Sequence, residues 1–576
     1  MKYKLLLLLT SAALGLFSSA ALITWMQSPG DASFMKIFVY TMGSTAFFYL
    51  FFMIDAFNKL TEFLKKPLYL SASFFFSLLF LISLMGEPDH ILTRPWYLAV
   101  PIFLSVFAVL FVFSATLIYS VIHYKKEVLP LNSPKLKIFL YAVPCCLVWL
   151  VYWASFFPGN MSPDSFNHWN QITSQEFSNW HPVVYTWLMI ALHSIWASPA
   201  VMGLFQILLL ASIIGYGVHT LGKAGIKRWI LWTLVGLYAL APMNGIFPVT
   251  LWKDVIYNAA LLLFTIIMAN IVLSRGTWIT KYSHMLLLFV TALAIALFRN
   301  NGFPIVLIML VLLLIAYRPY FRQLLGAGAA VIGVYIIITV PLFQALDVKS
   351  ANATESLSMP IQQIARTISE DGNLSAEQSE YLSSILPLEL WEENYDPYIT
   401  DDIKFHEEYN SDIILNDFSG FLKTWASVVL NNPIIALEAY AKQTSLAWQI
   451  NEPEDGYTSE YSIGITDNEE GLEPAPLLTG MNERLTEWLD YSRGEFIEIF
   501  WRPAAFTLLI LLFSFSSSAH NGWKAWLVAM PVLLNTGTIL AGLPAQDFRY
   551  LFGNALVLFF IITFSFVHFS GKKDPV

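Results

Sequence analysis

The residues with the clearest potential for chemistry lie in one polar stretch, residues 157–182, between two apolar runs. Residues 162–164, a serine, a proline and an aspartate, predict the start of a helix. Serine is a favoured N-cap, proline suits the first helical position, and an acid is stabilised in the first turn. Asp164 and His168 would then lie one helical turn apart on the same face. With His181 before the next apolar run, the stretch predicts one carboxylate and two imidazoles close together.

The other candidate residues stand at the predicted outer ends of later apolar runs. They are Lys253, Asp254, Arg299, Asn301, Arg549 and Tyr550. Arginine and lysine can neutralise a phosphate, and arginine can do so with two parallel hydrogen bonds. A carboxylate can take a proton from a hydroxyl or hold a divalent cation. An acid beside several cations therefore suits a reaction in which a lipid phosphate leaves. The alternative is that the cations only reach the lipid headgroups and that the histidines only hydrogen-bond the loop.

The composition indicates which elements must hold these residues. Of the 576 residues, 56% are hydrophobic and 13% are charged, and the mean hydropathy is +0.59. Soluble domains carry about 25% charged residues, and several apolar runs here reach the length of about 20 residues that crosses a bilayer. We therefore expect a polytopic membrane protein. The adjacent Cys145 and Cys146 cannot form a disulfide framework, and no basic segment interleaved with aromatic residues indicates binding to nucleic acid.

The apolar runs predict an all-α membrane protein with about fourteen transmembrane helices. We place these helices near residues 5–26, 34–55, 67–86, 96–122, 137–156, 199–219, 229–247, 251–273, 284–299, 303–317, 324–346, 501–518, 523–543 and 549–569. A further run, residues 183–197, is short for a span, so we expect it to lie along the outer interface or to be re-entrant. The first run could instead be a signal peptide, but its continuation through Trp25 favours a transmembrane helix.

Basic residues between the runs predict the orientation. Lysines gather in alternate loops, which are expected to be cytoplasmic. They include Lys59, Lys65, Lys66, Lys125, Lys126, Lys135 and Lys137, together with the C-terminal Lys572 and Lys573. This pattern predicts a multi-pass cell-membrane protein with both termini in the cytoplasm. Residues 157–182 and 347–500 would then be extracytoplasmic.

Residues 347–500 interrupt the apolar pattern and contain most of the 41 acidic residues. We expect an acidic, soluble domain with helices near 375–386, 419–430 and 433–448 and a loop over 451–476. The chain would then have four parts. These are an N-terminal four-helix membrane extension (1–136), a membrane module with the outer loop 157–182 (137–346), the acidic extracytoplasmic domain (347–500) and a C-terminal three-helix membrane segment (501–576).

Five short motifs follow one another on one predicted side. They are Ser-Pro-Asp-Ser from residue 162, Asn-Trp-His-Pro from 179, Leu-Trp-Lys-Asp from 251, Arg-Asn-Asn-Gly from 299 and Asp-Phe-Arg-Tyr from 547. The order of a membrane span, an outer loop with an early Asp and a His-Pro near its end, and a long run of further spans before an outer domain resembles the GT-C superfamily of glycosyltransferases. The five motifs are similar to those of an uncharacterised group of bacterial, mostly Gram-positive, GT-C-like membrane proteins. The resemblance covers residues 137–346 best and implies a GT-C-like membrane module there.

The resemblance implies roles for two residues of the loop. Asp164 would be the base or a metal-linked acid, with Mg or Mn as the divalent cation, and His181 would act beside the donor phosphate. Lys253, Arg299 and Arg549 are candidates for phosphate contacts on the grounds of charge and side. This loop has one aspartate instead of a paired acidic signature, and one proline instead of two after His181. Metal dependence therefore stays open.

These observations predict an inverting membrane glycosyltransferase. It would move a sugar from a polyprenyl-phosphate-type lipid donor to an extracytoplasmic cell-envelope acceptor, with membrane lipids as surroundings and no nucleic acid as partner. An alternative is a transporter or flippase of a lipid-linked saccharide, which predicts polar residues along the middle of several helices. A third reading, a scaffold without catalysis, predicts that Asp164 and His181 can vary without loss of function.

Overall fold

The computed structural model describes residues 2–27, 32–53, 56–86, 94–124, 134–453 and 458–569. This part of the chain is all-helical: 77% is helix, and its β-structure consists of isolated bridges. Lys125, Lys126, Lys572 and Lys573, on which part of the predicted orientation depends, lie outside the described residues. The all-helical prediction is confirmed for the residues described.

Within the described residues, eight segments are long and apolar enough to cross a membrane, or nine if a bent helix pair counts as one span. The eight segments are Leu7–Met26 of α1 (Lys2–Met26), α6 (Trp96–Ile122), α7 (Leu136–Ser155), α10 (Ala200–Lys223), α13 (Lys253–Leu273), Arg318–Ala345 around α16 (Phe321–Ile337), Thr479–Asn521 with α26 (Thr479–Phe500) and α27 (Pro503–Asn521), and Phe548–Ser565 with α29 (Phe552–Ser565). The bent pair consists of α11 (Arg228–Leu240) and Pro242–Val249. These helices are consistent with a multi-pass membrane protein.

Five further apolar helices of the described chain are shorter than a full span. They are α4 (Pro67–Ser83), α9 (Val183–His193), α14 (Tyr282–Phe298), α15 (Gly302–Ala316) and α28 (Met530–Gly542). Helix α9 has eleven residues, in line with the expectation that this run is too short to span. The other four short helices, α4, α14, α15 and α28, coincide with predicted spans. The total of fourteen spans therefore stays a prediction.

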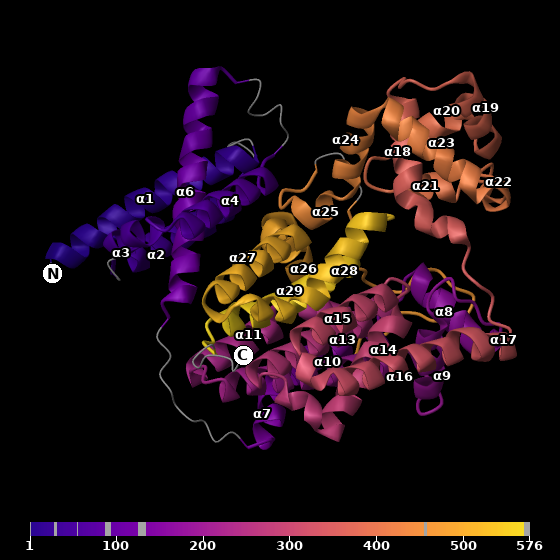
Figure 1. Ribbon diagram of the computed structural model, residues 1–576, viewed down its shortest axis with the longest axis horizontal. Coiled ribbons are helices and arrows are strands. Elements are labelled where there is room, and N and C mark those ends of the chain that lie inside the picture. Colours follow the sequence, from indigo (N-terminus) through magenta and orange to yellow (C-terminus); the bar gives the residue numbers. More distant parts are fainter. Residues whose placement is uncertain are drawn as a thin grey trace.

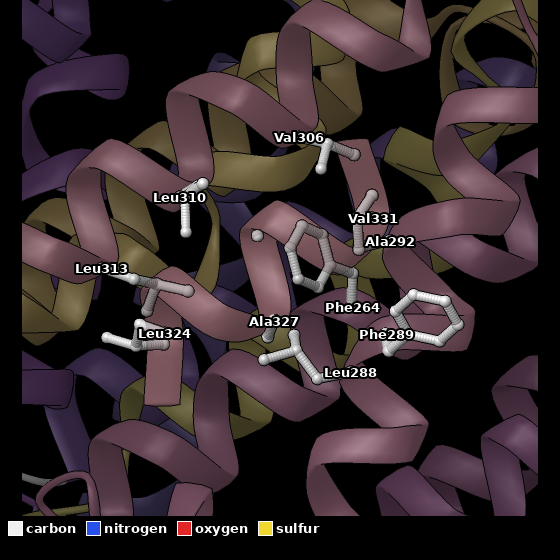
Figure 2. A pocket seen from close by; sticks show the side chains of 11 residues that line it. Phe264, Leu288, Phe289, Ala292, Val306, Leu310, Leu313, Leu324, Ala327 and Val331 are labelled. Carbon is white, nitrogen blue, oxygen red and sulfur yellow. The ribbon is translucent and has the colours of Figure 1, made fainter. Parts of the chain in front are cut away.

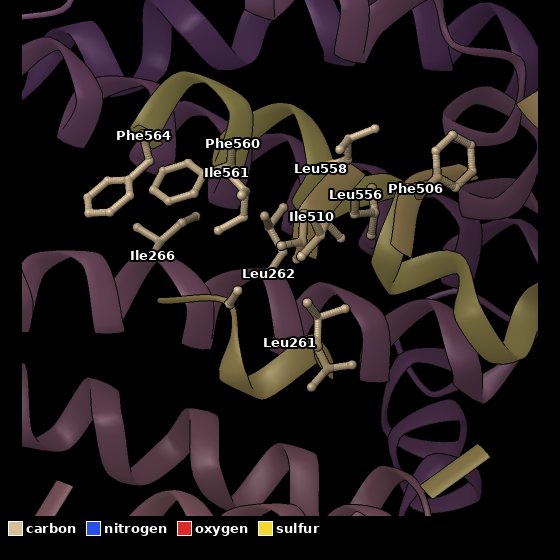
Figure 3. Close-up of a cluster of buried hydrophobic side chains, with 14 of the residues drawn as sticks. Leu261, Leu262, Ile266, Phe506, Ile510, Leu556, Leu558, Phe560, Ile561 and Phe564 are labelled. Atoms are coloured by element: carbon tan, nitrogen blue, oxygen red, sulfur yellow. The ribbon is translucent and has the colours of Figure 1, made fainter. Parts of the chain in front are cut away.

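The core of the membrane part forms around α13, α27 and α29 (Figure 3). Leu261 and Ile266 of α13 meet Ile510 of α27 and Phe560 of α29, and all four are buried. Asn554 of α29 is paired across helices, because its amide donates to the hydroxyl groups of Thr507 and Thr536 at 2.7 and 2.9 Å. Such pairs hold helices together where water cannot satisfy polar groups.

A small apolar cavity of about 30 Å³ lies among α13, α14, α15 and α16 (Figure 2). Its walls are carbon, from residues such as Phe264, Leu288 and Val331. A cavity of this kind lacks the polar partners that hold a buried water. It is a packing gap within the membrane part of the protein.

The N-terminal helices group at one end of the molecule (Figure 1). Helices α1, α2 (Phe34–Met53), α3 (Ala56–Leu64), α4 and α6 pack together, and α6 and α4 also contact α27. The acidic segment, residues 347–500, contacts these N-terminal helices at the ends of α1 and α4. The Ile450 N–H donates to the Ser83 carbonyl at 2.7 Å, and the Asn451 amide donates to the Met26 carbonyl at 3.0 Å.

The acidic segment forms a helical unit with its own core, seen at the upper right of Figure 1. The predicted helices are confirmed as α19 (Ala376–Ile385), α23 (Phe418–Asn431), α24 (Pro433–Gln443) and α25 (Ser445–Trp448). Trp391 is completely buried in that core. In the predicted loop over 451–476, the described residues contain no helix. The segment ends in α26, which leads directly into the apolar α27.

Candidate active site

Three irregular segments, distant in sequence, pair through backbone hydrogen bonds and form the frame of the site. The Asn160 N–H donates to the Val249 carbonyl at 2.9 Å, and the Leu251 N–H donates to the Asn160 carbonyl at 3.0 Å. The Met161 N–H donates to the Gly464 carbonyl at 2.9 Å. Residue 159 has φ +135°, and a Cβ there would lie 2.7 Å from Leu251, so glycine is required at this close approach. The frame holds the polar loop against the chain that precedes α13.

The loop then enters α8 (Pro163–Ser174), the helix that the sequence predicts. Ser162 and Ser165 form a reciprocal capping box. The indole N–H of Trp252 donates to the Ser162 hydroxyl at 2.8 Å. This contact brings the first turn of α8, with Asp164, beside the first turn of α13, with Lys253.

Arg549 reaches the same place from the C-terminal part of the chain. It lies in a short 3₁₀ turn, η7 (Phe548–Leu551), capped by the Asp547 carboxylate, which accepts a hydrogen bond from the Arg549 N–H at 3.0 Å. The Phe548 N–H donates to the Ser459 carbonyl at 2.8 Å. The acidic segment therefore holds this turn in register.

The Asp164 carboxylate is the centre of the cluster. Its Oδ2 lies 2.5 Å from Nη1 of Arg549 and 3.7 Å from Nζ of Lys253. Its Oδ1 lies 3.6 Å from Nε2 of His181, just beyond hydrogen-bond length. One carboxylate is thus held by two cations and an imidazole that come from three separate parts of the chain.

Three further ion pairs extend this arrangement. Asp254 lies 2.8 Å from Nη1 of Arg299 and 3.8 Å from Lys253, and Nε of Arg549 lies 2.7 Å from Asp547. The Asp254 side chain is only 1% exposed. Three acids therefore balance three cations in a largely buried network. Buried charges of this kind are costly unless each has a partner.

Aromatic rings support the two guanidinium groups. Arg549 lies over the rings of Trp252 and Tyr550, at 5.0 and 5.3 Å from their centres. Arg299 lies 4.7 Å from the centre of the Tyr550 ring and 5.7 Å from that of Tyr257. Tyr550 therefore lies between the two arginines, where cation–π attraction keeps both in place.

The environment of both histidines in the loop favours the neutral imidazole. Burial, together with the charge of Lys253, lowers the pKa of His181 below its ordinary value, although Asp164 acts in the opposite direction. Burial lowers the pKa of His168 still further. His168 binds the Thr186 hydroxyl through Nδ1 at 2.8 Å, and its ring lies 5.5 Å from the ring of His181. His168 is therefore one step removed from Asp164.

The two acids next to Arg549 differ in their tendency to hold a proton. Burial acts to raise the pKa of Asp164, but the charges of Arg549 and Lys253 and the contact with His181 outweigh it and hold the pKa well below its usual range. For Asp547, burial outweighs the charge of Arg549 and raises the pKa to about 6. Asp164 is therefore ionised at neutral pH, whereas Asp547 can take up a proton near pH 6.

The site also contains buried polar atoms without a hydrogen-bond partner. They are Nε2 of His168 and of His181, the Tyr185 hydroxyl, both carboxylate oxygens of Asp254, Nη1 of Arg299 and Nε of Arg549. The arginine atoms are close to acids, but the geometry is not aligned for a hydrogen bond. Buried polar groups are normally hydrogen-bonded, and each exception needs a reason such as a catalytic role or a bound water or ion. Their concentration around Asp164 points to a place where a polar ligand binds.

The nine predicted residues come together, with one at the edge. Asn301 donates to the Thr538 hydroxyl at 2.6 Å and to Asn535 at 3.3 Å, and so supports the packing of α28. It connects to the cluster indirectly, because the Tyr257 hydroxyl also donates to Asn535. Sequence reasoning did not select Trp252 or Asp547 as site residues. Both residues belong to the motifs Leu-Trp-Lys-Asp and Asp-Phe-Arg-Tyr. Their place beside the selected residues of these motifs was the signal that could have identified them.

The donor set around Asp164 does not fit a divalent cation. Among the residues that the structure describes, no group of three or more His, Cys, Asp or Glu side chains could hold a metal ion. The Asp164 Oδ2 atom faces two cationic side chains, and a metal ion would be repelled by both. The mechanism proposed below therefore uses no metal.

Comparison with known proteins places the chain in a family. A family of unknown function, DUF6020, matches residues 171–574, which is more than half of the chain. The protein belongs to DUF6020. The DUF6020 match includes His181, Lys253, Asp254, Arg299 and Arg549 and begins after Asp164 and His168. No curated protein and no solved structure matches the chain.

Proposed function

We propose that this protein is an integral membrane glycosyltransferase of the GT-C type. It would move a sugar from a polyprenyl-phosphate-type donor to an extracytoplasmic cell-envelope acceptor. One observation carries the proposal: the Asp164 carboxylate lies against Arg549 and Lys253, among buried polar atoms that lack partners. A proton acceptor beside phosphate-binding cations is the minimum that this reaction requires.

The donor phosphate would bind between Arg549 and Lys253, with Arg299 behind them. Lys253 lies between Asp164 and Asp254, at 3.7 and 3.8 Å, and is only loosely held by either. Arginine and lysine at such a site bind phosphate oxygens with charge-assisted hydrogen bonds. The atoms Nη1 of Arg299 and Nε of Arg549 have unused hydrogen-bonding capacity for that purpose.

Phosphate binding would also activate Asp164. The two cations beside Asp164 hold the pKa of this carboxyl well below its usual range, which makes it a weak base. A phosphate that draws Arg549 and Lys253 to itself removes part of this stabilisation, so the proton affinity of Asp164 rises. The base would become effective only when the donor is in place.

The chemical step is a displacement at the anomeric carbon of the sugar, and it needs no cofactor. The acceptor hydroxyl gives its proton to Asp164, and its oxygen forms a bond to the anomeric carbon of the sugar. The bond from that carbon to the phosphate oxygen breaks, with inversion at the carbon. The electron pair remains on the phosphate, where Arg549 and Lys253 stabilise the developing charge. His181, which lies 3.6 Å from Asp164, would orient the carboxylate.

The acidic segment supports a place for the acceptor. The ring of its exposed Phe405 packs edge-on against the ring of Trp180, with 6.3 Å between the ring centres. The Trp180 ring in turn stacks on that of His181, with 4.8 Å between the ring centres. This segment therefore reaches to within two side chains of Asp164. We assign it to binding the acceptor or closing over the site. Its acidity disfavours a strongly anionic acceptor.

The proposal is tested with purified full-length protein in proteoliposomes that contain a panel of labelled polyprenyl-phosphate sugars. Asp164→Asn keeps the shape of the side chain but removes the base, so we expect sugar transfer to fall by about 10²–10⁴-fold. Glu176→Gln is the matched control, because Glu176 follows α8 and forms only an exposed pair with Lys349. It should transfer sugar at the wild-type rate.

Two results would overturn the proposal. One is equal transfer by the wild type and a folded Asp164→Asn variant. The other is labelled lipid-linked sugar that crosses the bilayer at the same rate in both proteins, with no donor consumed. The second result would favour the transporter.

A further inference from the structure

A second, larger cavity lies far along the chain from Asp164, at the junction of the N-terminal helices with α26 and α27. Its volume is about 300 Å³, against about 30 Å³ for the gap shown in Figure 2. Most of its walls are apolar, for example Phe47 of α2, Phe113 of α6 and Leu509 of α27. Small-molecule sites begin at about 300 Å³. The cavity is therefore large enough for a ligand and too apolar for ordered water.

One end of this cavity is polar. Glu498 of α26 lines it and pairs with Lys36, in the first turn of α2, at 2.5 Å. Lys36 also donates to the Gln27 amide oxygen at 3.0 Å. The other carboxylate oxygen of Glu498, Oε2, is buried and has no hydrogen-bond partner, and the residue is only 6% exposed. A buried carboxylate oxygen in this position requires a donor.

The polar end coincides with the ends of helices. Lys36 follows the start of α2, Met26 ends α1, and both Met26 and Glu498 line the cavity. Lipid headgroups lie at the level of transmembrane helix ends, and lipid chains lie along the apolar walls below them. The cavity thus has the two-part character of a lipid, with an apolar body and, at the headgroup end, the Glu498 carboxylate as a hydrogen-bond acceptor.

We propose that this cavity binds one hydrocarbon chain of a membrane phospholipid whose headgroup carries an ammonium, and that the ammonium donates to Glu498 Oε2. An ammonium meets the unpaired oxygen with a charge-assisted hydrogen bond, which is stronger than one from a neutral hydroxyl. A headgroup with only phosphate or carboxylate oxygens offers no donor. The lipid joins the N-terminal helices to α26 and α27, and the site is independent of sugar transfer.

Two glycines allow a matched test. Gly43 lines the cavity, and a Cβ there meets no atom within 4 Å, so Gly43→Phe fills the cavity without a clash with the backbone. Gly236 of α11 is equally open but does not line the cavity, so Gly236→Phe is the control. The probe is a phosphatidylethanolamine with a photoreactive group on its acyl chain, mixed into liposomes with the purified full-length protein.

We expect cross-links in the wild type on segments 40–48 and 505–509. Gly43→Phe should lose them several-fold, and Gly236→Phe should keep them. Equal labelling of these segments in the two variants, or no labelling there in the wild type, overturns the site. A phosphatidylglycerol probe with the same chain should label the wild type several-fold less, and Glu498→Gln should abolish this preference. Equal labelling of the wild type by both probes overturns the ammonium assignment.

Discussion

Two ion pairs with the same length show how differently charges act in two regions of this molecule. In the acidic segment, Arg366 of α18 (Ser358–Ser369) lies one turn before Glu370, the C-cap residue of that helix, and the two side chains are 2.8 Å apart. In the candidate site, Arg299 and Asp254 are also 2.8 Å apart. The two arginine side chains are similarly buried, at 17% and 12% exposed, whereas the Glu370 side chain is 47% exposed and the Asp254 side chain 1%. The distance is the same, and the exposure of the acid differs.

The environment decides what each pair contributes. Water screens the exposed pair, so it is worth about 0.3–0.5 kcal/mol on a helix. The buried charges have lost their hydration, and removal of one partner leaves the other uncompensated. The exposed Glu370 carboxylate therefore contributes little to stability, whereas the site holds its charges in place at a cost in stability. A ligand that binds those charges would recover part of that cost.

Asp254→Asn should break this comparison most strongly. It leaves the Arg299 guanidinium buried without its acid, at a cost of about 3–5 kcal/mol. The measurement is thermal unfolding of the purified protein in detergent, where a clear fall in Tm is expected. A Tm shift no larger than that of Glu370→Gln would mean that burial does not distinguish the two regions.

Asp547→Asn tests the same contrast through pH. The pKa of Asp547 is raised from 3.8 to about 6, so folding takes up a proton between these values. This residue favours the folded state below about pH 4, and that contribution, ~3 kcal/mol, is lost as pH rises through about 6. Asparagine does not titrate. The stability of the variant relative to the wild type should therefore rise between pH 5 and pH 7.

Comparing the wild type with Asp547→Asn cancels the contributions that the other titrating groups of the site make to the pH dependence of stability. The lowered pKa values of His168 and His181 reduce stability as pH falls below their ordinary range, but they do so in both proteins. Unfolding midpoints in denaturant at pH 5, 6 and 7 supply the difference. A difference that is constant over this range would contradict a raised pKa for Asp547.

Glu370→Gln is the smallest expected effect and sharpens the other side of the comparison. The change should cost no more than about 0.5 kcal/mol, and high salt should reduce this further, because an exposed pair is screened. Chemical denaturation at low and high salt measures it. A loss of several kcal/mol would show that the acidic segment depends on its ion pairs for more than solubility.

The local features of the site could be read from the sequence, because neighbouring residues determine them. The serine and proline at 162 and 163 cap α8 in the structure as predicted. The helices α19, α23 and α24 follow from period and flanking residues. Polar motifs at the ends of apolar runs also led to the nine candidate residues, because ionisable groups are excluded from the middle of apolar helices.

The number of spans was harder to predict. Helices α14 and α15 are apolar throughout, but they have 17 and 15 residues, and composition cannot tell whether a helix of that length crosses, tilts or packs inside the protein. The sequence also carries no local signal for the backbone frame, in which residue 160 pairs with 250 and residue 161 with 465. These bridges depend on how the helices on either side pack.

By itself, the sequence determined the helices, their caps, the acidic segment and the set of charged residues available for chemistry. Only the tertiary structure decided which charges meet: Arg549 contacts Asp164 across 385 residues of sequence. It also decided that Asp547 holds its proton to about pH 6 while Asp164 stays ionised. The physical reason is that capping and hydropathy act over a few residues, whereas pairing and desolvation depend on which helices pack side by side.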